Sequence, residues 1–155
     1  MAYVAQAGEH QQLSWIGGST LSVLLDSAAT GGSLMVMSSE LAAGDAAPLH
    51  QHSREDEVFM ILTGSAVVWC GDERFEVGPG AVAYLPRDVP HTYRITSDHT
   101  RMLTLCTPAG LEGFFREAGH DLSTPLPDGF AITPAQMGPA SVAHGVTLLG
   151  PPPTD

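Results

Sequence analysis

Lysine is absent from the chain, and basic side chains of any kind are scarce. Six arginines oppose 17 acidic residues, and the formal net charge is −11 at pH 7. Without lysine, Schiff-base catalysis and the phosphate-binding P-loop are excluded, because both depend on its amine. The excess of acidic residues argues against nucleic acid or an anionic membrane as a partner, since either would need a basic face.

Cysteines and long apolar runs are scarce as well. The chain has two cysteines, Cys70 and Cys106, and its N-terminus has neither the basic start nor the apolar run of a secretory signal. We therefore expect reduced thiols and a cytoplasmic location. The longest apolar stretches, residues 58–62 and 66–70, are far too short to cross a bilayer, so no membrane partner is expected.

The sequence does contain a series of short apolar segments separated by turns. Its 155 residues suit a single apolar core, and its 17 glycines and 12 prolines suit many turns. Strands are predicted over residues 21–25, 33–41, 57–62, 65–70, 74–77, 81–85, 91–95 and 101–106. Short strands at this spacing, with glycine or proline between them, favour an antiparallel sandwich or barrel.

The ends of the chain follow a different pattern. Residues 1–20 give weak signals and are expected to be partly loose. Residues 111–120 have the amphipathic pattern of a short helix, and residues 134–145 predict a poorer one that Pro139 breaks. The tail from residue 146 could add one more strand.

These patterns together predict an all-β fold. We expect a small antiparallel β-barrel of jelly-roll type, followed by one or two short C-terminal helices. A single domain is expected over residues 1–155, with the barrel core at about 21–107 and the helical segment and tail at 108–155.

Polar groups are concentrated in the stretch LHQHSREDEVF, residues 49–59, at the start of an apolar strand. Side chains alternate along a strand, so His50 and His52 point the same way. By the same rule Glu57 shares a face with Phe59 and should point into the core. A pair of histidines is often only exposed polar surface, but a buried carboxylate is costly unless it is paired or bound to a metal.

His91 is a candidate fourth ligand, because it follows the rigid turn LPRDVP and begins another strand. Three imidazoles and one carboxylate form a mixed set that suits Fe(II), Mn(II), Ni(II), Cu(II) or Zn(II). One divalent transition metal per chain is therefore predicted, and its identity stays open. Glu55 and Asp56, by contrast, are expected to face solvent and to pair with Arg54 or another arginine.

The spacing of these residues resembles the two motifs of the cupin superfamily. Residues 44–64 read G-x5-H-x-H-x4-E-x6-G and match the first motif at every defined position. Residues 80–91 read G-x5-P-x-D-x2-H and match the second, with Asp88 in place of the usual glycine; Ile95 also stands where asparagine is often found. The resemblance covers about residues 33–120.

Two further segments resemble single-domain, quercetin-dioxygenase-like bacterial cupins: TPAGLEGFFREAG at 107–119 and HGVTLLGPPP at 144–153. Carried over residue by residue, the family implies a cupin barrel that holds a metal through the ligands His50, His52, Glu57 and His91. The family's homodimers also imply a homodimer here, and apolar residues on both faces of strands 58–62 and 66–70 agree with this.

The activity that this resemblance implies is a dioxygenase reaction. A flavonol or another small aromatic enol would bind the metal, Glu57 would take its proton as catalytic base, and O2 would then add with release of carbon monoxide. The predicted wall of the substrate pocket comprises Phe59, Ile61 and Tyr93, with Phe114 of the expected helix as a further candidate.

Two other classes of function remain open. Small cupins also act as metal-dependent isomerases, cyclases or decarboxylases, but sugar-phosphate or oxalate substrates would need cationic partners, and the chain has no lysine. A non-catalytic small-molecule-binding cupin is the other alternative. Oxygen uptake with an aromatic enol distinguishes an enzyme from a binding protein.

Overall fold

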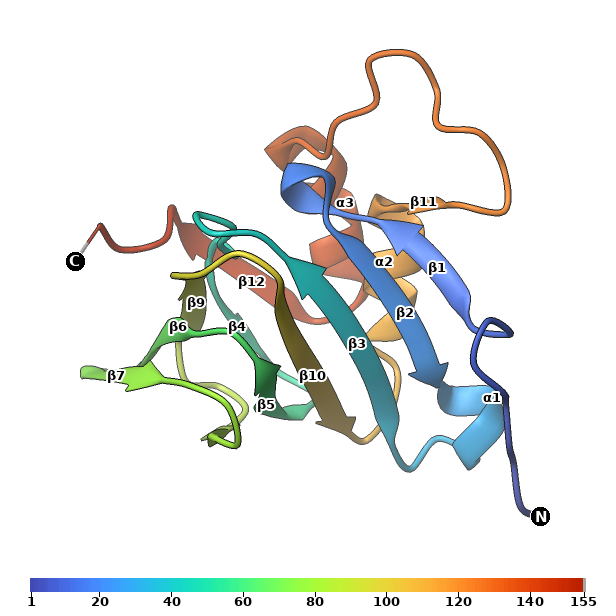
Figure 1. Cartoon of the computed structure of the whole chain (residues 1–155), viewed down its shortest axis with the longest axis horizontal. Coiled ribbons are helices and arrows are strands. Elements are labelled where there is room, and N and C mark those ends of the chain that lie inside the picture. Colours follow the sequence, from blue (N-terminus) through green and yellow to red (C-terminus); the bar gives the residue numbers. More distant parts are fainter. Residues whose placement is uncertain (155) are drawn as a thin grey trace.

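Two antiparallel sheets form the framework of the protein in its computed structural model, which describes residues 1–154 (Figure 1). The seven-stranded sheet contains, in spatial order, β11 (His120–Asp121), β1 (Gln11–Ser14), β2 (Thr20–Leu25), β3 (Met35–Leu41), β10 (Thr100–Thr107), β5 (Asp56–Thr63) and β8 (Val82–Leu85). The five-stranded sheet contains β12 (Val146–Gly150), β4 (Leu49–His52), β9 (His91–Ile95), β6 (Ala66–Cys70) and β7 (Glu73–Val77). The predicted all-β, jelly-roll fold is confirmed, although the described strands form two separate sheets and not one closed barrel.

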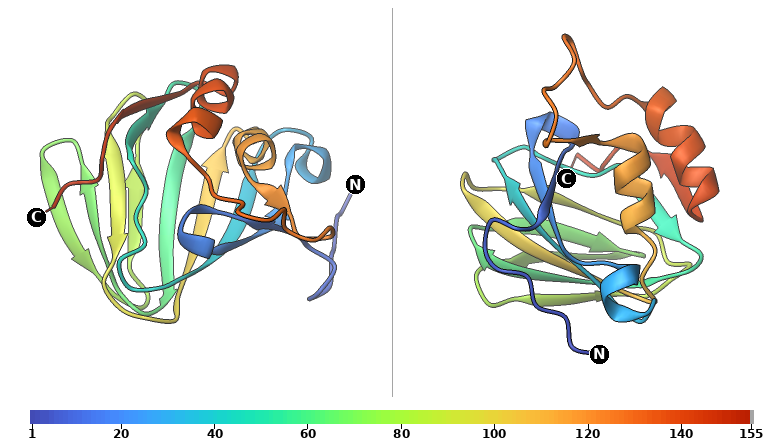
Figure 2. Two further views of the ribbon diagram at one scale, coloured as in Figure 1. Left: turned by 90° about the horizontal axis from the view of Figure 1, so that it is seen from above. Right: turned by 90° about the vertical axis from the view of Figure 1, so that its right-hand side faces the viewer.

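Three short helices complete the fold: α1 (Ser27–Thr30), α2 (Glu112–Ala118) and α3 (Pro134–Ala143). A single 3-10 turn covers Ile16–Gly18. Figure 2 shows α2 and α3 side by side at one end of the two sheets. Within residues 1–154, no helix has the length and apolar character needed to traverse a bilayer.

The pleat of β5 explains how a carboxylate reaches the interior. Glu57, Phe59 and Ile61 are all buried, whereas the side chains between them lie on the outer face of the sheet. The strand ends at Thr63 and is followed by Gly64, whose φ of 80° belongs to the left-handed region. A Cβ atom at this glycine would lie 2.8 Å from the Cα of Thr100, so only glycine fits the turn.

Asp88 adopts the left-handed conformation as well, with a φ of 64°. This backbone accounts for the glycine that is usual at this position of the second cupin motif, because glycine enters the region without strain. Aspartate is among the few other residues that tolerate it. The turn therefore keeps its shape and delivers His91 to the start of β9.

One prediction about the ends of the chain holds in part, and one is wrong. Residues 1–10 form no helix or strand, but residues 11–14 form β1, which pairs with both β2 and β11 and buries Leu13. Pro139 does not break the second helix, because α3 runs through it. A capping box of Thr133 and Gln136 fixes the start of α3, and a buried face that includes Ala140 holds it in place.

The apolar interior is divided into two clusters of buried side chains. One joins β1, β2 and β3 to the C-terminal helices and includes Leu13, Met35 and Leu111. The other lies between the two sheets and includes Ile61 of β5 and Ile95 of β9. Both cysteines, Cys70 and Cys106, are free thiols, as expected.

Candidate metal centre

Four potential metal ligands converge from three strands. His50 and His52 lie on β4, Glu57 on β5 and His91 on β9. His50 and His91 are direct partners across the β4–β9 ladder, so the second sheet places their rings together. Each of the four residues offers one donor atom, and these atoms all lie within 4.8 Å of one another. The structure thus brings together all four residues that the sequence singled out.

The Glu57 carboxylate lies at the centre of this group. Its Oε2 atom is 2.9 Å from Nε2 of His91 and 3.4 Å from Nε2 of His52. Glu57, His52 and His91 are each at most 3% exposed. Its other oxygen, Oε1, lies 3.9 Å from the sulfur of Cys106.

Backbone carbonyls fix the orientation of two of the rings. Nδ1 of His50 lies 2.7 Å from the carbonyl oxygen of Pro48, and Nδ1 of His91 lies 3.0 Å from that of Val89. In both cases the carbonyl belongs to the residue two positions earlier. A ring that donates from Nδ1 keeps an unprotonated Nε2, which is the form that binds a metal.

The charge states of His50 and Glu57 also suit metal binding. Burial, followed by the neighbouring imidazoles, lowers the pKa of His50 to about 4, so this ring is neutral at pH 7. Burial alone would raise the pKa of Glu57, but contacts with His52 and His91 outweigh it and hold the pKa below its ordinary value. Burial likewise opposes a charge on His52, but the Glu57 carboxylate raises its pKa overall.

These observations show that the donor set fits a metal ion. Bonds of about 2.0–2.2 Å place ligand atoms at most about 4.4 Å apart, close to the spread found here. His52 supports the same conclusion, because both of its ring nitrogens are buried without a hydrogen-bond partner. Buried polar atoms seldom stay unpaired, and a cation at the centre would satisfy Nε2.

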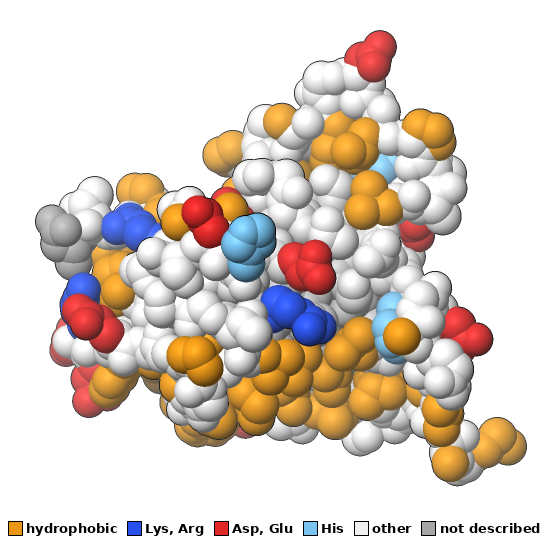
Figure 3. All heavy atoms as spheres, viewed as in Figure 1, with side chains coloured by type: hydrophobic (Ala, Val, Ile, Leu, Met, Phe, Trp, Pro, Cys, Tyr) orange, Lys and Arg blue, Asp and Glu red, His pale blue; other side chains and the backbone are white. Residues whose placement is uncertain are grey.

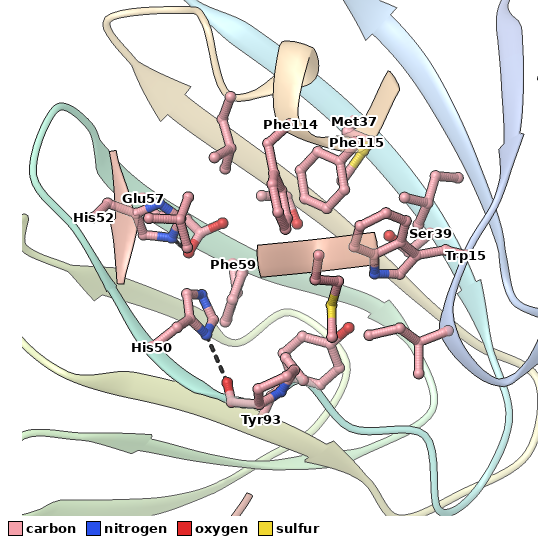
Figure 4. A pocket seen from close by; sticks show the side chains of 18 of the residues that line it. Trp15, Met37, Ser39, His50, His52, Glu57, Phe59, Tyr93, Phe114 and Phe115 are labelled. Atoms are coloured by element: carbon pink, nitrogen blue, oxygen red, sulfur yellow. Dashed lines mark hydrogen bonds and ion pairs between the residues drawn. The ribbon is translucent and has the colours of Figure 1, made fainter. Parts of the chain in front are cut away.

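Three of the four donors, His50, His52 and Glu57, lie at one end of a pocket between the two sheets (Figure 4). The pocket has a volume of about 60 Å³ and is mainly apolar. Besides the cluster, its polar lining consists chiefly of the hydroxyl groups of Ser39, Thr104 and Tyr93. Within the described chain, none of the six arginines lines it.

Aromatic side chains close the pocket opposite the donors. Phe114 and Phe115 of α2 meet Trp15 edge to face, with ring centres 5.4 Å and 4.9 Å apart. Figure 4 shows these three rings across the pocket from His52 and Glu57. The sequence assigned no role to Trp15, and no local pattern around it could have done so, because β1 carries it to the pocket.

The structure also places the predicted substrate-binding residues. Phe59, Tyr93 and Phe114 line the pocket, and Phe59 packs against Tyr93 with ring centres 5.5 Å apart. Ile61 shares the inward face of β5, but it lies in the core cluster beyond the pocket and does not line it.

The prediction for the two acidic residues before Glu57 is half wrong. Asp56 does face outwards, and its carboxylate accepts hydrogen bonds from the guanidinium and the backbone of Arg87. Glu55, however, is only 3% exposed. Glu55 directly precedes β5, and extending the alternation of that strand back by one residue would have placed it on the same side as Glu57.

Fold and site together define a small two-sheet β protein with a His/Glu cluster that could hold one metal, set in an apolar pocket. Comparison with known proteins agrees with this class. The family model described as "Cupin domain" matches residues 37–108. Residues 37–108 of the chain thus form a cupin domain, as the two motifs predicted.

Individual relatives give more detail. Quercetin 2,3-dioxygenase of Bacillus subtilis (strain 168) is 31% identical over 117 residues, which are 76% of this chain and 34% of that enzyme. A Streptomyces coelicolor protein is 33% identical over 54 residues, or 35% of this chain and 51% of that protein. The chain thus spans about a third and about half of the lengths of these relatives.

Solved structures support the fold. The structure of KdgF from Halomonas sp. matches with a TM-score of 0.65 at 18% identity, covering 72% of this chain and 98% of that one. At this level of identity the likeness shows the shared cupin fold alone.

Proposed function

We propose that the protein is a metal-dependent dioxygenase that acts on a small aromatic enol. The observation that carries this proposal is the cluster of three imidazoles and one carboxylate, which opens into an apolar, aromatic-lined pocket. His50, His52, Glu57 and His91 would hold one divalent transition metal. The similarity to a quercetin 2,3-dioxygenase supports the same class of reaction.

The residues of the pocket have separate tasks in this proposal. The metal, when bound, supplies a Lewis acid that lowers the pKa of an enol hydroxyl. Glu57 is the carboxylate of the donor cluster, and it accepts the enol proton, whose own pKa the metal would lower. Phe59 and Tyr93 contact the planar ring, and the enclosed apolar pocket keeps water away from the reacting atoms.

The lack of arginine in the described pocket lining supports a neutral substrate over an anionic one. Phosphate or carboxylate groups buried in this pocket would lack a cationic partner other than the metal, and such burial is costly. A neutral substrate that attaches through one oxygen meets no such penalty. This favours an aromatic enol over the sugar phosphates or oxalate that an isomerase or decarboxylase would require.

Pocket size sets a further condition. An apolar cavity of roughly 150 Å³ accommodates benzene, and this pocket is smaller, at about 60 Å³. The cover formed by Trp15, Phe114 and Phe115 therefore has to move when an aromatic substrate enters. A compact enol needs a smaller displacement than a full flavonol.

Mixing the substrate with metal-loaded protein tests the proposal directly. Without oxygen, quercetin and the smaller 3-hydroxychromone should each show a shifted absorption band, because the enol oxygen binds the metal. Admitting O2 should bleach this band, consume oxygen and release carbon monoxide. The five metals named above are reconstituted in turn, and metal-free protein is the control.

Each alternative has its own outcome in this experiment. Unshifted spectra in every metal-replete form would contradict enol binding. A shift without oxygen consumption for any metal would identify the protein as a small-molecule-binding cupin. Turnover of 3-hydroxychromone but not quercetin would identify the cover as the determinant of substrate size.

We also propose that the protein assembles as a homodimer through the outer face of the seven-stranded sheet. One cross-strand row on this face comprises Leu25, Val36, Leu105, Val58 and Tyr84, and the next includes Leu103, Met60 and Val82. Figure 3 shows a broad apolar area over β3, β10 and β5. The face of a sheet that lies in water normally carries polar side chains. An apolar face of this extent therefore favours burial against a protein partner.

Replacing Leu103 with glutamate should dissociate this dimer. The substitution places a charge at the centre of the apolar face, and we expect dimerisation to weaken at least about 10-fold, which is about 1.4 kcal/mol. Light scattering across a dilution series measures the effect. Thr147→Glu, on an exposed position of β12 in the other sheet, is the matched control. A monomeric wild-type protein at micromolar concentration would contradict the proposal.

A further inference from the structure

Glu55 is a buried carboxylate without a hydrogen-bond partner for one of its oxygens. The residue is 3% exposed, and its Oε2 atom is buried and unpaired. The loop after β10 closes over it, since a Cβ atom at Gly110 would lie 3.8 Å from its Oε1 atom. Such a group is retained only where it meets a suitable partner.

The group that Glu55 faces is His52. Oε2 of Glu55 lies 3.7 Å from Nδ1 of His52, and this nitrogen is also buried without a hydrogen-bond partner. The distance exceeds a hydrogen bond by roughly 0.5–1 Å, so a small rotation of one carboxyl group closes it. Arg54, the adjacent cation, donates instead to the carbonyl of Ala143, 3.2 Å away.

His52 is also the exception among the three imidazoles. His50 and His91 each direct Nδ1 at a backbone carbonyl two residues earlier. His52 has no such carbonyl partner and has a carboxylate in the same place. A charged acceptor orients the ring as a carbonyl does, and in addition it makes the imidazole a stronger ligand.

We propose that Glu55 is a positioning residue for metal binding: its carboxylate accepts the Nδ1 hydrogen of His52 and so aims Nε2 of that ring at the metal. This inference rests on the proposed metal site. The donor set stays at four residues, and Glu55 supports it as a fifth residue that acts only through His52.

Cobalt affinity, measured by competition with a chelator, tests this role without any assay of turnover. Glu55→Gln keeps a weaker, neutral acceptor, and Glu55→Leu removes it. We expect Co(II) to bind about 10-fold more weakly to the first variant and about 100-fold more weakly to the second. The matched control is Asp56→Asn, which removes the adjacent negative charge from a side chain that points outwards to Arg87.

A double-mutant cycle separates positioning from general electrostatics. In a His52→Ala background, Glu55→Leu should cause no further loss of cobalt affinity, whereas in a His50→Ala background its effect should persist. The paramagnetically shifted ring N–H signals of the Co(II) protein give an independent readout. Glu55→Leu should displace or remove one of three such signals and leave the other two in place.

Several results would overturn the role of Glu55. These are an affinity unchanged within twofold in both Glu55 variants, a loss equal to that of Asp56→Asn, or a persistent loss in the His52→Ala background. Failure of the proposed metal site looks different, because wild-type protein would then not bind cobalt at all. If Glu55→Leu does not fold, Glu55→Gln decides the question.

Discussion

Replacing His50 with alanine is expected to weaken metal binding by more than about 100-fold while leaving the fold intact. Loss of a residue that merely supports a ligand already costs about 10- to 100-fold in affinity, and loss of the ligand itself should exceed this. His50 is the most informative of the three histidines to replace, because its ring makes no close contact with the Glu57 carboxylate.

The same substitution at His91 is expected to remove the metal and also to destabilise the fold. His91 is fully buried and lies 2.9 Å from Glu57, so its loss leaves a buried carboxylate with one fewer partner. Metal content after dialysis and thermal unfolding of the metal-free protein separate the two effects. His10→Ala, at a histidine outside the cluster, is the control. Full metal occupancy in the His50 and His91 variants would show that the ligand assignment is wrong.

Replacing Glu57 with glutamine is expected to reduce turnover by about 10²- to 10⁴-fold, the range that a general base contributes. The amide has nearly the same shape as the carboxylate, but it carries no charge and cannot accept the enol proton. Metal affinity should fall less than turnover, because the three imidazoles remain. Oxygen consumption is measured at saturating metal, so that weaker metal binding is not mistaken for a loss of catalysis.

Asp56→Asn is the control for this experiment, since it removes a negative charge one residue away on the outer face of the strand. Its turnover should match that of the wild type. Equal losses of metal affinity and turnover in Glu57→Gln would mean that Glu57 acts only as a ligand. An unchanged rate would exclude it from the reaction.

Alternation along strands made much of the architecture predictable. Each strand predicted before residue 107 is found, with ends that differ by at most two residues. The four donor residues belong to two local sequence motifs. Each motif includes residues of a strand, so the donors converge once these strands take their places in the fold. The single-domain boundaries, the cytoplasmic location and the dimer stay predictions.

The errors arose where distant segments decide the structure. β1 has a weak local signal, and it is a strand because β2 and β11 supply partners on both sides. Trp15 reaches the pocket by the same route. Glu55 was assigned to solvent on its charge alone, whereas its parity with Glu57 and the loop around Gly110 bury it.

The pairing of β12 with β4 has a consequence for the order of events during synthesis. His52 and His50 are the direct partners of Val146 and Leu148, so the strand that supplies two donors is flanked by a segment almost one hundred residues later in the chain. A ribosome extends the chain by about 5–20 residues per second, with the N-terminal part emerging first. The histidines therefore leave the ribosome several seconds before their flanking strand exists, and until then β9 is the one neighbour that can pair with β4 in the described sheet.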